Sequence, residues 1–96
     1  IFSRYGGEEF VILLPETSPE SAAEIAGRIR AKIESSPVRS ADITIPVTAS
    51  FGVYGEPIVA AEQTLSAMID SADKALYDAK NTGRNRVCCA PSQTQN

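Results

Sequence analysis

Residues 4–10 read Arg-Tyr-Gly-Gly-Glu-Glu-Phe, and this stretch decides how the 96-residue chain begins to fold. Apolar residues flank it on both sides, so the sequence predicts an incoming strand over residues 1–5 and an outgoing strand over residues 10–14. Gly6 and Gly7 supply the positive φ values that a two-residue turn requires. We therefore predict a tight β-hairpin whose tip is followed by two adjacent carboxylates.

The hairpin tip combines features that suit a metal-bound nucleotide. With no side chains at Gly6 and Gly7, a phosphate could approach the backbone amides closely. Glu8 and Glu9 offer the hard oxygen ligands that Mg²⁺ prefers. Glycine pairs are common in turns, however, and acids beyond a turn are usually a solvated strand end. The motif alone therefore does not establish a metal site.

Composition limits the classes of function. At 96 residues the chain is one domain or part of one, with a modest core. Its net charge of −3 argues against a polymeric nucleic acid as partner, because proteins that bind nucleic acid carry clustered lysines and arginines and are usually basic. The sequence contains no histidine, which excludes Ser-His and Cys-His nucleophiles and most zinc sites. Cys88 and Cys89 are adjacent and would face opposite sides of a strand, so we expect reduced thiols.

The chain contains no apolar run long enough to span a bilayer and no charged-then-apolar leader. We therefore expect a cytoplasmic domain, or the cytoplasmic part of a membrane-bound sensor, with no export signal and no membrane contact by this segment.

Two amphipathic helices are predicted from apolar residues at three-to-four spacing. The first begins at Pro19 behind the capping residue Ser18, and Ser-Ser-Pro at residues 35–37 stops it. The second runs from about residue 64 to residue 80, and Gly83 closes it.

Strict alternation of apolar and polar residues from 43 to 54 predicts a strand. Pro46 cannot donate to a ladder, so we expect the paired portion to run from Val47 to Tyr54, with the earlier residues at an edge or bend. Residues 86–89 are predicted to form a last short strand, and residues 91–96 a frayed polar tail. Together these elements predict an α+β fold: a mixed, mainly antiparallel sheet flanked by helices.

Lys80 and Arg84 stand on either side of residues 81–83 at the exit of the second helix. Two cations there could bind an anion, although a lysine in a last turn commonly only complements the helix dipole. Glu24 and Arg28 stand four residues apart on the first helix, so the simplest role of Arg28 is an exposed ion pair.

Three motifs in order resemble the C-terminal half of a GGDEF domain, the catalytic domain of bacterial diguanylate cyclases. They are residues 4–10 quoted above, Thr-Ala-Ser-Phe-Gly-Val at 48–53, and Ala-Asp-Lys-Ala-Leu-Tyr-Asp-Ala-Lys-Asn-Thr-Gly-Arg-Asn-Arg-Val at 72–87. The resemblance covers residues 1–87 as a partial domain and leaves 88–96 as a strand end and polar C-terminal tail. The fold it implies is the nucleotidyl-cyclase palm, a relative of the ferredoxin-like fold.

The resemblance implies an enzyme that condenses two GTP molecules into cyclic di-GMP with release of pyrophosphate, in bacterial second-messenger signalling. Its cofactor would be Mg²⁺ or Mn²⁺. Glu8, where the family name has Asp, matches a metal ligand that is also proposed as the catalytic base, and Glu9 matches the next motif carboxylate. Neighbours on a strand diverge, so Glu8 ranks above Glu9 for metal contact. Gly6 and Gly7 would lie under the phosphates and ribose of the nucleotide.

By the same resemblance, Lys80 and Arg84 match the pair that grips the terminal phosphates of the substrate. Arg28 occupies the position of a secondary contact to inhibitory cyclic di-GMP. Three further family positions are expected to hold the last helix and strand in place: Asp73, Tyr77 and Asn85.

The upstream part of the family domain is absent from this sequence, including a first strand with another metal-binding Asp and the residues that read guanine. We therefore expect this segment alone to be inactive. The implied partners are GTP, cyclic di-GMP and a second GGDEF domain in a homodimer, because the product is two-fold symmetric. Two alternatives stay open. One is a catalytically silent GGDEF domain that binds GTP or cyclic di-GMP as a regulatory module, and the other is a plain α/β structural domain.

Overall fold

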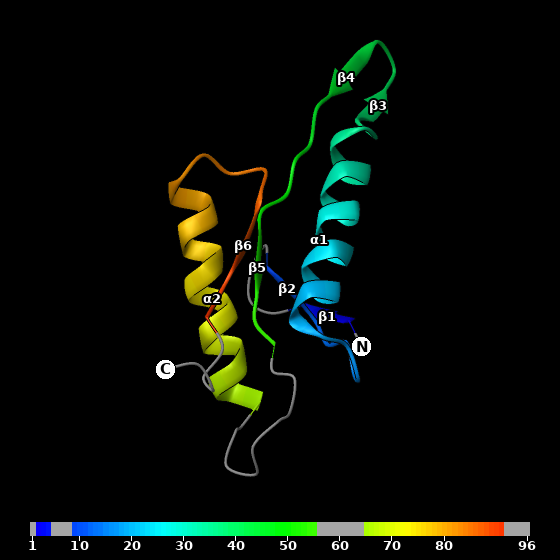
Figure 1. Ribbon diagram of the computed structural model, residues 1–96. Coiled ribbons are helices and arrows are strands. Elements are labelled where there is room, and N and C mark those ends of the chain that lie inside the picture. Colours follow the sequence, from blue (N-terminus) through cyan, green and yellow to red (C-terminus); the bar gives the residue numbers. More distant parts are fainter. Residues whose placement is uncertain (1, 5–8, 56–64, 92–96) are drawn as a thin grey trace.

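The computed structural model of the chain describes residues 2–4, 9–55 and 65–91. Within these residues, two helices and six short strands follow one another, which confirms the α+β class (Figure 1). In chain order they are β1 (Phe2–Arg4), β2 (Phe10–Ile12), α1 (Pro19–Glu34), β3 (Val38–Ser40), β4 (Ile43–Ile45), β5 (Phe51–Val53), α2 (Leu65–Asn81) and β6 (Val87–Cys89).

Helix α1 begins and ends where the sequence predicts. The Ser18 hydroxyl accepts a hydrogen bond from the Ser21 amide at 3.1 Å, and Pro19 is the first helical residue. At the other end the Ser35 amide donates to the Ala31 carbonyl at 3.0 Å. Local capping chemistry therefore defines both boundaries.

Helix α2 is described from Leu65 to Asn81, within one residue of the prediction at both ends. The Thr82 amide donates to the carbonyl of Asp78 at 3.0 Å, which closes the last turn. Gly83 follows with a φ of 132°, a region that favours glycine. The prediction that Gly83 closes the helix is confirmed.

The first hairpin forms, but its register differs from the predicted one. β1 and β2 pair antiparallel with Arg4 opposite Phe10. A regular two-residue turn at Gly6 and Gly7 would instead place Arg4 opposite Glu9. The predicted two-residue turn is therefore wrong by one position of register. Residues 5–8 themselves lie outside the described residues.

The long strand predicted over residues 47–54 is also wrong. β5 includes only Phe51–Val53, and β4 ends at Ile45 before Pro46, which has no amide hydrogen to donate. β4 instead pairs antiparallel with β3 in a hairpin that the sequence did not reveal. Alternation of apolar and polar residues indicates which face of a segment is apolar, but a strand also needs a neighbouring backbone to pair with. Val47, which lies between β4 and β5, is 37% exposed.

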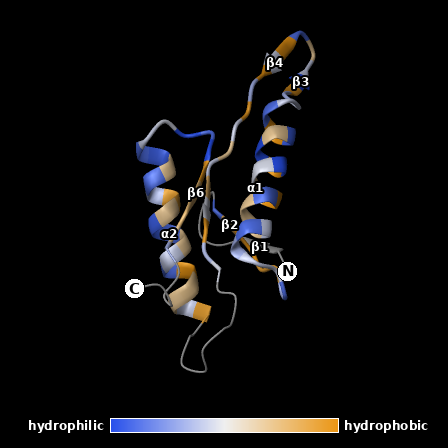
Figure 2. Ribbon diagram, viewed as in Figure 1, coloured by the Kyte–Doolittle hydropathy of each residue, from blue (hydrophilic) through white to orange (hydrophobic). Residues whose placement is uncertain are grey.

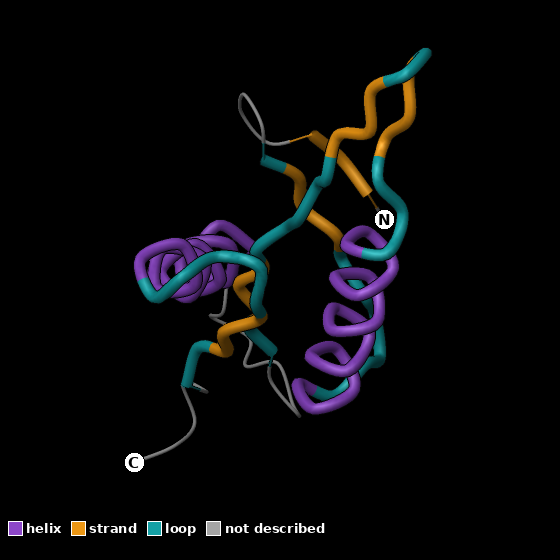
Figure 3. Tube along the Cα trace, turned by 90° about the horizontal axis from the view of Figure 1, so that it is seen from above, coloured by secondary structure: helices purple, strands orange, loops and turns teal. Residues whose placement is uncertain are grey.

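The β3–β4 hairpin extends beyond the C-terminal end of α1 (Figure 1 and Figure 3). All the residues of its two strands are exposed. The principal dimensions of 53 × 25 × 22 Å show how far the molecule departs from a sphere.

The parallel pair of β5 and β6 forms the centre of the structure, and Phe51 lies opposite Val87. The two strands run between α1 and α2, and both helices contact them (Figure 1). β6 matches the short strand predicted over residues 86–89. With two antiparallel pairs and one parallel pair, the described strands are mixed and mainly antiparallel.

Small residues make the contact between β5 and α2. A Cβ atom at Gly52 would overlap the Ala72 carbonyl oxygen and the Leu76 amide nitrogen, which are backbone atoms of the helix. Ala75 and Ala79 on the same helix are 4% and 0% exposed. In the part of the chain that the structure describes, no large side chain is fully buried. Close backbone approach, rather than bulky side chains, therefore forms the core.

Strand β2 carries apolar side chains that the described residues leave uncovered. Phe10 and Ile12 are 56% and 41% exposed. β2 and β5 belong to different two-stranded sheets. Apolar residues recur along the strands of these sheets (Figure 2). An open face of this kind agrees with a partial domain.

The contact at Gly52 leads to a stability prediction. Replacing Gly52 by Ala places a methyl group against helix backbone that cannot move aside, so unfolding free energy should fall by about 1–3 kcal/mol. Gly27→Ala is the matched control, because no atom beyond its chain neighbours and the backbone of its own helix lies within 4 Å of a Cβ at that position. This control should raise stability by roughly 0.5–1 kcal/mol through helix propensity. Urea unfolding of the domain measures both, and equal effects of the two variants would contradict the Gly52 contact.

Candidate functional site

Glu9 connects the first hairpin to the end of α2. Its Oε2 atom accepts a hydrogen bond from Lys80 Nζ at 3.2 Å, and the two groups form an ion pair. Both side chains are 37% exposed, so solvent and solutes reach the pair. The structure thus brings together two predicted site residues, one from the Gly-Gly-Glu-Glu motif and one from the last motif.

A small cavity lies beside this ion pair. Its lining residues are Glu9, Asp73, Leu76, Tyr77 and Lys80, and its volume is about 130 Å³. A drug-sized or cofactor-sized ligand needs roughly 300 Å³ or more. The cavity is therefore one wall of a nucleotide site at most.

Tyr77 differs from expectation. Its side chain is 69% exposed and contributes to the cavity, so it does not hold α2 against the last strand. Asp73 is also exposed on the same side of the helix. The residues of α2 that are buried are instead the small residues Ala75 and Ala79.

Three predicted site residues, Gly6, Gly7 and Glu8, lie outside the described residues. Their roles at the phosphates and at the metal stay predictions. Glu9 has an ammonium group on one carboxylate oxygen, and its role as a metal ligand also stays a prediction. No cluster of three acidic, histidine or cysteine side chains occurs within residues 2–4, 9–55 and 65–91.

Arg84 lies in the turn between α2 and β6. Its amide donates to the Ala79 carbonyl at 2.9 Å, and its own carbonyl accepts a hydrogen bond from Arg86 Nε at 3.1 Å. The Arg84 side chain is exposed. The amide and the carbonyl of Arg84 are therefore both held by hydrogen bonds, while its side chain is exposed to solvent.

Arg28 forms the exposed ion pair that its spacing predicts. Its Nη2 lies 3.1 Å from Glu24 Oε1, and the two side chains are 74% and 68% exposed. Such pairs contribute little to stability because water screens them. Among the described residues, the hydrogen bond and ion pair of Arg28 are with Glu24 on its own helix, and its role in binding an inhibitory ligand stays a prediction.

The sequence did not reveal a hydrogen-bond network between α1 and the turn before β6. Arg30 Nη1 donates to Asn85 Oδ1 at 2.9 Å and to Glu34 Oε1 at 3.0 Å. Asn85 Nδ2 donates to Glu34 Oε2 at 2.8 Å, and the Asn85 amide donates to the Ser50 hydroxyl at 3.0 Å. Asn85 was expected to hold the last helix and strand in place; its hydrogen bonds instead join the turn before β6 to α1 and to Ser50, so the expected contact with α2 stays a prediction. The spacing of Arg30 and Glu34 was visible in the sequence, but their distant partner was not.

This network lowers the pKa of Glu34. The hydrogen bond from Asn85 is the main cause, and the hydrogen bond and positive charge of Arg30 act in the same direction. Both contacts favour the ionised carboxylate.

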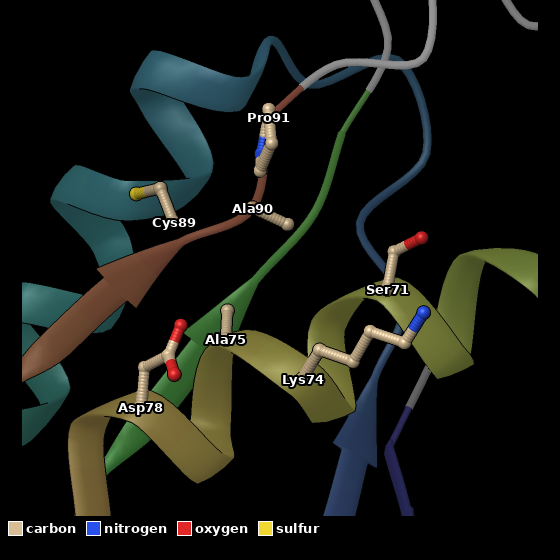
Figure 4. A pocket seen from close by; sticks show the side chains of 7 residues that line it. All are labelled: Ser71, Lys74, Ala75, Asp78, Cys89, Ala90 and Pro91. Carbon is tan, nitrogen blue, oxygen red and sulfur yellow. The ribbon is translucent and has the colours of Figure 1, made fainter. Parts of the chain in front are cut away.

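A second cavity of about 230 Å³ lies on the opposite side of α2, next to the end of β6 (Figure 4). It is lined by Ser71, Lys74, Ala75, Asp78, Cys89, Ala90 and Pro91. None of the predicted site residues lines it. Lys74 therefore offers a cation on α2 that is remote from the pair of Glu9 and Lys80.

Neither described helix has the length and apolar character needed to cross a membrane.

Comparison with known proteins gives consistent matches. The family described as "Diguanylate cyclase, GGDEF domain" matches residues 1–86. Diguanylate cyclase A of Treponema denticola is 41% identical over 87 residues, covering 88% of this chain and 22% of that protein. Diguanylate cyclase VdcA of Vibrio cholerae is 45% identical over 87 residues, covering 88% of this chain and 25% of that protein. The chain thus spans about a quarter or less of the length of these relatives.

Two solved structures share the arrangement of helices and strands. Diguanylate cyclase SiaD from Pseudomonas aeruginosa, in complex with its activator SiaC, has a TM-score of 0.82 at 38% identity. The match covers 94% of this chain and 34% of that one. The GGDEF domain of DgcB from Caulobacter crescentus, in complex with c-di-GMP, has a TM-score of 0.79 at 32% identity. That match covers 92% of this chain and 52% of the other.

The lowered pKa of Glu34 leads to a pH prediction. A carboxylate whose folded pKa is depressed stabilises the fold above its unfolded pKa, about 4.3, and the contribution is lost as pH falls through the folded pKa. Glu34→Gln should therefore destabilise the domain at about pH 7, and its effect should shrink at an acid pH below both the unfolded and the folded pKa. Glu24→Gln, which removes the exposed pair with Arg28, serves as the control and should show little effect. Thermal unfolding at both pH values tests this, and a pH-independent effect of Glu34→Gln would contradict it.

Proposed function

The chain belongs to the GGDEF domain family, and from this premise we propose that it is the C-terminal part of a domain that condenses two GTP molecules into cyclic di-GMP. In that reaction each ribose 3′-hydroxyl attacks the α-phosphate of the other nucleotide, and pyrophosphate leaves. The observation that carries the proposal is the ion pair of Glu9 and Lys80, which joins the two motifs at one accessible place.

Lys80 and Arg84 supply the positive charge that this proposal requires. Lys80 lies in the last turn of α2, against Glu9. Arg84 lies in the turn that follows and is held there by a hydrogen bond of its backbone amide. A triphosphate carries several negative charges, and its terminal phosphates would compete with Glu9 for the Lys80 ammonium. Charge neutralisation and positioning are the main protein contributions to phosphoryl and nucleotidyl transfer.

The donor chemistry of Glu8 and Glu9 fits Mg²⁺ or Mn²⁺. Carboxylate oxygens are hard ligands, and the described member of the pair, Glu9, is 37% exposed and accessible. These two residues would hold the ion, and Glu8 is also the candidate base for the attacking hydroxyl. When bound, the ion would polarise the phosphoryl oxygens and neutralise their developing charge.

The proposal includes partners outside this chain. The product is two-fold symmetric, so two domains, each with one GTP, would face each other in a homodimer. Arg28, exposed on α1, would serve as a secondary contact to inhibitory cyclic di-GMP. This segment by itself is expected to be inactive, because the upstream strand with the second metal ligand is not in the sequence. A silent regulatory domain that only binds nucleotide is the alternative that the following experiments separate.

Glu8 should be essential for turnover. In the complete protein, Glu8→Gln keeps the shape of the side chain and removes its charge, so cyclic di-GMP production should fall by about 10²-fold or more. Glu20→Gln, at the exposed start of α1, is the control and should leave turnover within about twofold, since surface substitutions rarely matter. Near-normal synthesis by Glu8→Gln would contradict its role. Binding of GTP by a wild-type protein that makes no cyclic di-GMP would favour the silent regulatory domain.

Lys80 should act on substrate affinity. Lys80→Met keeps the apolar stem and removes the ammonium, so the KM for GTP should rise by roughly 10-fold, as expected for losing a charged hydrogen bond. Lys74→Met is the matched control on the same helix, because Lys74 lines the cavity on the opposite side. Initial rates across a GTP series measure both variants. An equal change in KM for the two would show that Lys80 contributes only general charge.

A further inference from the structure

The turn between α2 and β6 has an unusual backbone. Gly83, Arg84 and Asn85 have φ values of 132°, 62° and 49°, so three consecutive residues occupy the left-handed region. Arg84 and Asn85 are not glycine, and such residues stay in this region only where surrounding contacts hold them. The contacts that hold the turn therefore also determine where Arg84 lies.

Asn85 is the residue through which the turn is held. Its backbone amide donates to the Ser50 hydroxyl at 3.0 Å. Both ends of its side-chain amide are also engaged: Oδ1 accepts from Arg30 at 2.9 Å, and Nδ2 donates to Glu34 at 2.8 Å. Three hydrogen bonds thus fix the orientation of one residue, and two of them come from α1.

Arg30 and Glu34 are themselves fixed relative to each other. Their side chains form an ion pair at 3.0 Å across one turn of α1, and the Arg30 side chain is only 26% exposed. Glu34 uses one carboxylate oxygen for Arg30 and the other for Asn85. If either charge were lost, the other residue and Asn85 would each lose a hydrogen-bond partner within the protein. Their polar groups would then stay unpaired or bind water instead.

We propose that Arg30 and Glu34 are positioning residues for Arg84. The inference rests on the proposed function, in which Arg84 binds a phosphate of GTP. Arg84 is held on its N-terminal side by the hydrogen bond to Ala79 and on its C-terminal side by Asn85. When Arg30 or Glu34 is removed, Asn85 is released from the left-handed region, and the direction of the Arg84 side chain changes with it.

Lys80 makes this proposal specific. It lies within α2, whose backbone is held by β5, and its contact is with Glu9 rather than with α1. The network at Asn85 therefore acts on one of the two candidate phosphate contacts and leaves the other in place. A network that merely stabilised the fold would affect both.

The first measurement is independent of GTP. In the full-length protein, amide hydrogen exchange of Arg84 and Asn85 should become about 10-fold faster in Glu34→Gln, while exchange at Ala75 within α2 stays the same. Ser50→Ala removes the acceptor of the Asn85 amide from the opposite side and should give the same result. Glu24→Gln, which removes the other ion pair of α1, is the matched control and should change neither position.

The second measurement is a double-mutant cycle on the initial rate of cyclic di-GMP synthesis. Glu34→Gln should raise the KM for GTP by roughly 3–10-fold with kcat nearly unchanged. In an Arg84→Ala background the same substitution should add less than about twofold, because its route to the substrate has been removed. In a Lys80→Met background it should add its full factor, because those two residues act separately.

Each result decides the proposal. Unchanged exchange at Arg84 and Asn85, or the same factor in both backgrounds, overturns the positioning role. If the wild-type protein binds no GTP, the proposed function fails, and the exchange measurement still decides whether α1 holds the turn. Faster exchange together with coupling to Arg84 alone supports the proposal.

Discussion

The close approach of β5 to α2 at Gly52 is the constraint on which the rest of the structure depends. Position 52 has no side chain, so the strand lies directly against the backbone of Ala72 and Leu76. The buried residues of the same helix, Ala75 and Ala79, are equally small. A short distance between backbones, rather than a large apolar volume, thus holds α2. The helix in turn carries Lys80 and leads into the turn that carries Arg84.

Two polar contacts then hold the end of α2 and the turn that follows it, each from a different direction. Glu9 reaches Lys80 from the first hairpin, and Arg30 with Glu34 reaches Asn85 from α1. Segments that are distant in the chain therefore converge on the last turn of α2 and on the turn that follows it. The two contacts differ in kind, since the first is an accessible ion pair that an anion could disrupt. The second is a hydrogen-bond network that maintains an unfavourable backbone conformation.

Prediction from sequence succeeded where the determining forces are local. Ser18 and Pro19 define the start of α1 through contacts within one turn, and the end of α2 follows from Gly83. It failed where a strand needs a partner. Alternation over residues 43–54 predicted one long strand, whereas the backbone pairs only in part, on either side of Pro46. Similarly, Gly6 and Gly7 indicated a hairpin correctly but not the register, which the ladder between Arg4 and Phe10 determines.

The sequence by itself determined the helices, the α+β class and, through three ordered motifs, the family and its candidate residues, because motif spacing and helix capping are properties of adjacent residues. Only the tertiary structure decided that Glu9 meets Lys80, that Tyr77 faces solvent, and that Arg30 and Glu34 hold Asn85. Glu9 and Lys80 are 71 residues apart, and Arg30 and Asn85 are 55 apart. No local pattern encodes such contacts, because they arise only when the β5–β6 pair places both helices beside it.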